Sequence, residues 1–307
     1  MKRVLVTGAS GCVGRQAVPL LIHRGWEVHA VALGEAPSDF PGPVWHVGNL
    51  LDPSDAKRVV DEAGADALLH LAWFIAPGQW ARSPENLDWV TVSLALGRAF
   101  RERGGRRMVS AGSCLEYDWD YGFCSERLTP CRPHTLYGTA KHALRLMLEG
   151  YAHESGLSLA WGRIFFLYGP WEHPDRLIAS VIRSLLKGER ARCSHGMQVR
   201  DYLYAGDVAG ALVTLLESDL TGPVNIASGQ AVTLRQLAGR AGELLGLRDR
   251  IDFGAIPSAP TDKPLVVGDV SRLATELGWR PAFTVDDGLG RTIEWWREQA
   301  NREKGSA

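Results

Sequence analysis

Residues 4–18, "VLVTGASGCVGRQAV", decide the fold of this chain. An apolar strand runs up to Thr7, glycines follow at positions 8, 11 and 14, and a helical pattern begins in the same stretch. Glycines at this spacing permit a tight turn, an approach of backbone amides to a diphosphate, and close packing of helix on strand. The diphosphate then lies at a helix N-terminus. An ordinary glycine turn is the alternative, but the context predicts a dinucleotide site comprising Gly8, Ser10, Gly11, Cys12, Val13 and Gly14.

Short β-branched runs alternate with helical patterns through the first half of the chain. Several of these runs are apolar throughout, which indicates a sheet covered on both faces. The rhythm predicts an α/β fold with a doubly wound parallel sheet, and residues 1–168 are expected to form its dinucleotide-binding domain. The expected strands are 3–8, 27–33, 44–48, 66–73, 106–113 and 157–169.

Beyond Gly169 the pattern is less regular, and residues 169–307 are expected to form a smaller mixed α/β lobe that binds substrate. The strand and helix near 200–228 are expected to return to the first domain. No repeat or low-complexity linker separates the halves, so we expect them to pack together with a cleft between them. Helices are expected near 176–187, 207–217, 233–245 and 286–300, with strands at 199–204 and 222–228.

Composition and charge favour a small-molecule substrate. The chain has 307 residues, of which 45% are hydrophobic and 22% charged, and a net charge of −1, which disfavours nucleic acid or anionic lipid as a partner. No stretch approaches the roughly 18 apolar residues of a membrane span, and the start lacks a signal peptide, so a cytoplasmic location is expected. The five cysteines show no CxxC spacing, so neither a disulfide framework nor a metal site is indicated.

Further cofactor contacts are expected where the next strands end. The second strand ends in Ala32, Leu33 and Gly34, with Glu35 beyond it. Neither the acid that binds the NAD ribose nor the base that binds the NADP phosphate stands at the usual place, so both NAD and NADP stay open. The adenine and the nicotinamide half are expected against the residues that follow the third and fourth strands, which are Asn49, Leu50, Leu71, Ala72 and Trp73.

Tyr137 and Lys141 stand four residues apart in a predicted helix and therefore share a face. A nearby ammonium stabilises a phenolate and lowers the phenol's pKa, so Tyr137 would exchange protons near neutral pH. Lys141 would also hydrogen-bond the nicotinamide ribose. The spacing alone fits a packed tyrosine and a solvated lysine equally well. Ser113 ends the fifth strand at the edge where such sheets keep their sites, and with it the three residues predict a catalytic set.

Together with the glycine loop, Ser113, Tyr137 and Lys141 make the chain resemble the extended short-chain dehydrogenase/reductase family. These are the NAD-dependent epimerases and dehydratases, which mostly act on nucleotide sugars. "HLAW", "RIFFLYGP", "QVRDYLYAGDVAGAL" and "LGWRPAF" are similar to the family's HLAA, RxxNVYGP, RDFIYVDDVA and LGW-P signatures. The resemblance covers nearly the whole chain and implies a Rossmann-type fold.

The resemblance also implies roles for individual residues. Tyr137 would be the proton donor or acceptor, Ser113 its partner at the substrate oxygen, and Lys141 the residue that holds the ribose. Arg200 would lie against the substrate's diphosphate. Residues 85–103 and the Tyr137 helix would form a homodimer.

The chain departs from the family pattern after the catalytic serine. The dehydratases carry an Asp-Glu pair there, because eliminating water needs an additional acid and base, whereas this chain has Cys114 and Leu115. Sugar 4,6-dehydration is therefore disfavoured, although Glu116 one step further on keeps it open.

Usual diphosphate contacts are also replaced. Phe166 stands for an asparagine and Ala259 for an arginine, with Lys263 or Arg272 as candidate substitutes. A histidine near the catalytic tyrosine either contacts the substrate or simply lies in an exposed loop. The expected substrate contacts are Cys114, Phe166, Arg200 and His134.

The remaining aromatic and histidine residues are interpreted mainly as structural. His70 is expected to be a core histidine, and Trp295 and Trp296 are expected to attach the C-terminal helix to the body. No more than a third of the tryptophans assigned to the cleft or its surroundings are expected to touch a ligand. These are Trp73, Trp80, Trp89, Trp119, Trp161 and Trp171.

The combined pattern predicts an NAD(P)-dependent oxidoreductase that acts on a nucleotide sugar, with reduction of a 4-keto(-6-deoxy)hexose at C4 as the favoured reaction. A 4-epimerase that retains NAD would use the same residues. Two usual diphosphate contacts and an NAD-selecting acid are missing, and both absences favour the reductase. The alternative of another class is a non-catalytic dinucleotide-binding sensor, which is disfavoured because Tyr137 and Lys141 are both present.

Overall fold

The computed structural model describes residues 2–76, 78–258 and 262–305. Its centre is a seven-stranded sheet in which every neighbouring pair of strands is parallel, with the order β11-β7-β5-β4-β1-β2-β3. This confirms the predicted doubly wound parallel sheet. The strands are β1 (Arg3–Thr7), β2 (Glu27–Ala32), β3 (Val44–Val47), β4 (Ala67–His70), β5 (Arg107–Ser113), β7 (Ser158–Ile164) and β11 (Gly222–Ile226).

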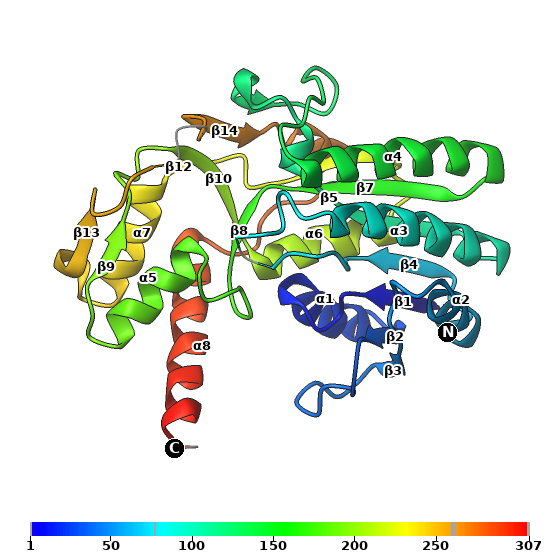
Figure 1. Cartoon of the computed structure of the whole chain (residues 1–307), viewed down its shortest axis with the longest axis horizontal. Helices are drawn as coiled ribbons and strands as arrows, with labels where there is room; N and C mark the ends of the chain where they lie inside the picture. The colour runs from blue at the N-terminus through cyan, green and yellow to red at the C-terminus, as the bar shows by residue number, and fades with distance from the viewer. Residues whose placement is uncertain (1, 77, 259–261, 306–307) are drawn as a thin grey trace.

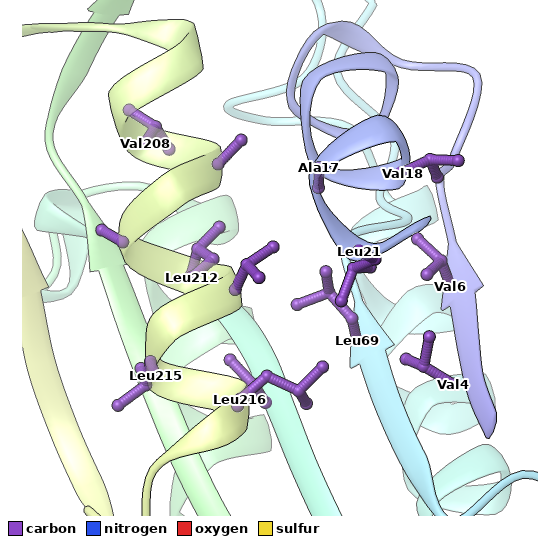
Figure 2. Packing of buried hydrophobic residues seen from close by; sticks show 14 of the residues in the cluster. Val4, Val6, Ala17, Val18, Leu21, Leu69, Val208, Leu212, Leu215 and Leu216 are labelled. Atoms are coloured by element: carbon purple, nitrogen blue, oxygen red, sulfur yellow. The ribbon is translucent and has the colours of Figure 1, made fainter. Parts of the chain in front are cut away.

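Helices cover both faces of this sheet (Figure 1). One face carries α1 (Cys12–His23) and α6 (Ala205–Glu217), and the other carries α2 (Pro53–Ala63), α3 (Glu85–Glu102) and α4 (Leu136–Ser155). Figure 2 shows Val6 and Leu69 of the sheet near Leu21 of α1, with Leu212 of α6 across from them. Burial on both faces explains why the strands are apolar throughout.

A second, smaller lobe follows the carboxyl ends of these strands; the arrows of β1 and β4 point toward it in Figure 1. It contains a five-stranded sheet, a two-stranded sheet and three helices that share an apolar cluster. The strands are β6 (Phe123–Cys124), β8 (Phe166–Tyr168), β10 (Val199–Tyr204), β12 (Ala231–Thr233) and β14 (Leu265–Gly268), with β9 (Ala191–Cys193) paired to β13 (Ile251–Phe253). The helices are α5 (Leu177–Leu186), α7 (Leu234–Leu244) and α8 (Val285–Gly305).

Four short helical turns complete the secondary structure of the described ranges. Three are 3-10 helices and one is a π-helix. They are Cys114–Glu116, Trp119–Tyr121, Arg248–Arg250 and Arg272–Glu276. In the part of the chain that the structure describes, no helix is both long and apolar enough to cross a bilayer.

The single strand predicted over 157–169 is wrong, because the chain changes sheets inside it. β7 ends at Ile164, the amide of Phe165 donates to the backbone oxygen of Ile226 at 3.1 Å, and β8 then pairs with β10 in the other sheet. A continuous apolar run carries no sign of which sheet each half joins. Within 200–228, α6 and β11 lie with the seven-stranded sheet, whereas β10 belongs to the second sheet.

Candidate active site

The glycine loop lies against the end of β4. Gly8 has φ +69°, and a Cβ there would lie 2.7 Å from the amide nitrogen of Ala72. A Cβ at Gly14 would lie 2.2 Å from the Gly8 oxygen, so only glycine lets α1 pack this closely. The N-cap of α1 is Gly11, which provides no side-chain cap, and the first amides of the helix stay available to a phosphate.

The expected adenosine region lies at the ends of β2 and β3. Leu33, directly after β2, is 77% exposed. The amide of Asn49 donates to Asp55 Oδ2 at 2.9 Å, and its Oδ1 accepts from the amide of Leu51 at 3.1 Å, so Asn49 shapes the turn into α2. Leu50 is buried beneath this turn.

A basic residue that the sequence reasoning missed lies close by. Arg15 donates from both Nη atoms to the Asp39 carboxylate at 3.0 and 3.1 Å, and its guanidinium lies over the rings of Phe40 and Trp171. Its place directly after Gly14 was the available signal. This ion pair joins the first turn of α1 to the loop after β2.

Ser113, Tyr137 and Lys141 come together at the carboxyl edge of the sheet. Ser113 lies near enough to Tyr137 to lower the pKa of its phenol, and Lys141 Nζ lies 5.9 Å from the Tyr137 ring centroid. Lys141 is buried and donates to the backbone oxygen of Ala111 at 2.8 Å. Thr135 begins this helix: its Oγ1 accepts from the amide of Gly138 at 3.0 Å, so it acts as the N-cap of α4.

The pKa of Tyr137 differs from the prediction. Desolvation raises the pKa of this half-buried phenol above its usual value, while the nearby Ser113 side chain opposes the rise. Burial also lowers the pKa of Lys141 to about 7, with Glu116 acting in the opposite direction. In the protein alone, desolvation therefore outweighs the expected lowering by the ammonium.

Glu116 faces the protein interior. Its carboxylate is fully buried and accepts from the amide of Ser113 at 2.8 Å, from Trp161 Nε1 at 2.8 Å and from Arg163 Nε at 3.0 Å. Glu116 thus stabilises the turn that follows Ser113. Trp161 is fully buried in this network, although the sequence places it among the cleft tryptophans.

Two of the expected substrate residues meet on the side of the smaller lobe. Arg200 is buried with its guanidinium 5.4 Å from the ring centroid of Phe166 and 5.8 Å from that of Trp119. Its Nη2 forms an ion pair with Asp262. Cys114 is buried next to this group, where its backbone oxygen accepts from Trp119 Nε1 at 2.8 Å.

His134 and the candidate substitutes have other partners. The His134 side chain is largely exposed and lies 3.8 Å from Asp118. The two candidate substitutes for the missing diphosphate contacts form ion pairs, Lys263 with Asp120 and Arg272 with Glu276. Ala259 lies outside the described residues.

A second missed basic residue stands beside the tyrosine. The rings of Trp80 and Tyr137 meet edge to face at 4.9 Å between centroids, and the Arg176 guanidinium lies 5.4 Å over Trp80. Among the described residues, no ion-pair partner of Arg176 is found. Burial raises the pKa of nearby Glu172 to about 8, and Arg176 opposes this rise. Arg176 directly precedes α5, in a loop that has no distinctive sequence signal.

His70 is part of a buried hydrogen-bond chain. Its Nδ1 lies 2.7 Å from Thr7 Oγ1 and its Nε2 lies 2.8 Å from Ser93 Oγ. Burial, assisted by the charge of Lys141, lowers the pKa of His70 to about 3. This histidine therefore links β1, β4 and α3, as its interpretation as a core residue predicts.

Comparison with known proteins gives one family for the chain. The profile of the NAD dependent epimerase/dehydratase family matches residues 4–227. UDP-glucuronic acid decarboxylase 1 of Xenopus tropicalis is 26% identical over 98% of this chain and 74% of its own length. The dTDP-6-deoxy-L-talose 4-dehydrogenase (NAD(+)) of Aggregatibacter actinomycetemcomitans is 29% identical over 76% of this chain and 86% of its own. The UDP-glucose 4-epimerase of Thermus thermophilus in complex with NAD superposes with a TM-score of 0.84 at 27% identity, covering 96% of this chain and 99% of the other.

Proposed function

Because the chain belongs to the NAD-dependent epimerase/dehydratase family, whose members modify nucleotide sugars, we propose that it reduces the C4 ketone of a nucleotide-linked 4-keto-6-deoxyhexose. The observation that carries this proposal is the cluster of Ser113, Tyr137 and Lys141 at the sheet edge that also holds the glycine loop. The 4-dehydrogenase relative acts, by its name, at the same carbon of a 6-deoxy sugar nucleotide.

The glycine loop fits a dinucleotide, because glycines at positions 8 and 14 allow the loop, β4 and α1 to pack closely and the first amides of α1 have no side-chain cap. A reduced nicotinamide bound there would supply the hydride. Tyr137 would donate its proton to the C4 oxygen while Ser113 hydrogen-bonds that oxygen, and the Lys141 ammonium would stabilise the phenolate that remains. A raised pKa keeps Tyr137 protonated at neutral pH, which is the form that reduction requires.

The surroundings of Tyr137 favour reduction over epimerisation. A 4-epimerase must let the keto sugar turn over before the hydride returns, and this needs room beside the tyrosine. Here the rings of Trp80 and Trp73 both meet Tyr137 edge to face, at 4.9 and 6.2 Å, and Arg176 stacks on Trp80. Likeness to the UDP-glucose 4-epimerase keeps epimerisation as the second candidate. Dehydration is disfavoured further because Glu116 is turned inward.

Arg176 is the better candidate than Arg200 for the substrate's negative charge. The guanidinium of Arg200 is already compensated by Asp262, so a phosphate would have to displace that carboxylate. Arg176 has no ion-pair partner among the described residues and lies close enough to lower the pKa of Tyr137. An arginine in this state binds a phosphate oxygen readily. The contact of Arg200 with a diphosphate stays a prediction.

NAD is the cofactor that the arrangement favours over NADP. Arg15, which contacts the loop after β2, is neutralised by Asp39 and is therefore not free for a 2′-phosphate. The cytoplasmic location and the division of the chain at residue 168 stay predictions.

Turnover of purified protein separates the candidate functions. With dTDP-4-keto-6-deoxyglucose, we expect consumption of NADH and formation of the C4 alcohol. Conversion of UDP-glucose to UDP-galactose without added reduced cofactor would establish the epimerase instead. Binding of NADH without turnover of either substrate would establish the sensor and refute both enzyme proposals.

A further inference from the structure

Lys141 is held against the face of an indole ring. Its Nζ lies 3.7 Å from the ring centroid of Trp73, and it donates to the backbone oxygen of Ala111 at 2.8 Å. Only 2% of Lys141 is exposed, so its ammonium has lost most of its water and needs other groups in exchange. The Ala111 carbonyl accepts from one of the three N–H donors of the Lys141 ammonium. The electron-rich face of the Trp73 indole compensates in part for the water that the ammonium has lost.

Trp73 is itself fixed from α3. Its Nε1 donates to Asn86 Oδ1 at 2.8 Å. Asn86 is fully buried, and its Nδ2 donates to the backbone oxygens of Trp80 at 2.7 Å and Ser83 at 2.8 Å. These hydrogen bonds fix the position of the Trp73 indole ring. It stands in "HLAW", at a position where the family signature HLAA has alanine.

We propose that Trp73 is a positioning residue that fixes the ammonium of Lys141 beside Tyr137 and favours its protonated form. The proposal rests on the proposed function in so far as Lys141 there assists proton transfer. Without the indole, the Ala111 carbonyl would be the remaining partner of the buried Lys141 ammonium among these two groups. The neutral amine form of Lys141 would then be more populated.

Three titratable groups face Lys141 from the elements around it. They are His70 at the end of β4, Glu116 after β5, and Tyr137 on the same helix. The pKa of His70 is lowered to about 3 and that of Tyr137 is raised, so neither titrates between about pH 5 and 9. The pKa of Lys141, lowered by burial to about 7, lies within this window and is open to measurement.

The test is a titration of Lys141 in the substrate-free protein, with lysines carbon-13-labelled at Cε and followed by NMR. Trp73→Leu removes the aromatic face and is expected to lower the midpoint of Lys141 by about one pH unit. Trp73→Phe keeps a smaller aromatic face and is expected to lower it by less. Trp89→Leu is the matched control, because the Trp89 ring packs 6.0 Å from that of Trp73, whereas the ring contacts of the Lys141 ammonium are with Trp73 and Tyr137. In this variant the midpoint of Lys141 should equal that in the unmodified protein.

Either of two results would overturn the proposal: an unchanged midpoint in Trp73→Leu, or an equal shift in Trp89→Leu. If Trp73→Leu does not fold, Trp73→Phe decides, and a midpoint identical to that of the unmodified protein would overturn the proposal. The titration needs neither substrate nor turnover. A failure of the ketoreductase assay would therefore leave this result standing, and an unshifted Lys141 would leave the assay result standing.

Discussion

In the proposed reaction, the surroundings of Tyr137 prepare its phenol to donate a proton. Desolvation raises its pKa, the nearby Ser113 opposes that rise, and the buried Lys141 has its Nζ 5.9 Å from the ring centroid. Desolvation prevails, so the phenol stays protonated at neutral pH while the Ser113 hydroxyl lies close to it. Such a group is an acid that gives up its proton when a developing alkoxide is hydrogen-bonded to it.

Replacing this hydroxyl should remove turnover and leave the rest of the site intact. Tyr137→Phe is expected to lower kcat by about 1,000-fold, within the range that general acid catalysis contributes. The ring contacts with Trp80 and Trp73 remain, so the Kd for NADH should stay within about threefold of that of the unmodified protein. Stopped-flow kinetics and fluorescence titration measure the two quantities. An unchanged kcat in this variant would refute the proposed role of Tyr137 as the proton donor.

Single residues are also expected to decide the choice between NADH and NADPH in the proposed reaction. Asp39 is exposed and neutralises Arg15 next to the glycine loop. Asp39→Asn frees the guanidinium for a 2′-phosphate, so we expect kcat/KM for NADPH relative to NADH to rise about tenfold, mainly through a lower KM for NADPH. Arg15→Gln in the same background should cancel the gain. A ratio that is the same in all three proteins would show that Arg15 does not reach the ribose.

At the scale of elements, the site depends on how β1, β4, β5 and α3 are held in register. The chain Thr7–His70–Ser93 ties two neighbouring strands to the helix that covers them. Because His70 accepts and donates in a buried place, only its neutral form suits the folded protein. The low pKa of His70 therefore connects the packing of these elements to pH.

His70 should make the protein less stable in mild acid. Its pKa is about 3 in the folded protein and near 6.5 when exposed, so only the unfolded chain takes up this proton as the pH falls from 6.5 toward 3. Between pH 6.5 and 5 the loss from this group is about 2 kcal/mol in free energy of unfolding. In His70→Asn, urea unfolding should show a pH dependence smaller by that amount over the same interval. Parallel curves for the two proteins would contradict the assignment.

The elements also show how far sequence reasoning reaches. The glycine loop was predictable because Gly8 and Gly14 meet steric demands within one local strand–turn–helix unit. The change of sheet after Ile164 was not, because the pairing of β8 with β10 is decided by residues far along the chain. Arg176 was missed for the same reason, since it gains its place from Trp80, which is remote in sequence.

At the scale of the whole molecule, the outer faces of α3 and α4 carry exposed apolar side chains that the described part of the chain does not cover. These helices lie side by side on one flank of the seven-stranded sheet (Figure 1). Leu87 on α3 is 56% exposed, and Leu146 and Met147 on α4 are 51% and 61% exposed. Small residues continue this surface at Ala95, Ala143 and Gly150, which would let another helix approach closely.

We expect this surface to join two copies of the chain, as the resemblance of the sequence implies. Light scattering of the purified protein should give twice the mass of one chain, and Met147→Glu should give a monomer, because a carboxylate would be desolvated in a helix–helix interface. Leu128→Glu is the matched control: Leu128 is 83% exposed in the loop before α4, outside the two helices, and the variant should remain a dimer. A monomeric unmodified protein, or a Met147→Glu dimer of unchanged stability, would show that the contact uses another face or does not form. Tyr137 and Lys141 are on α4, so a partner chain that packs on this helix would also stabilise the site. The monomeric variant should then show a lower kcat than the dimer.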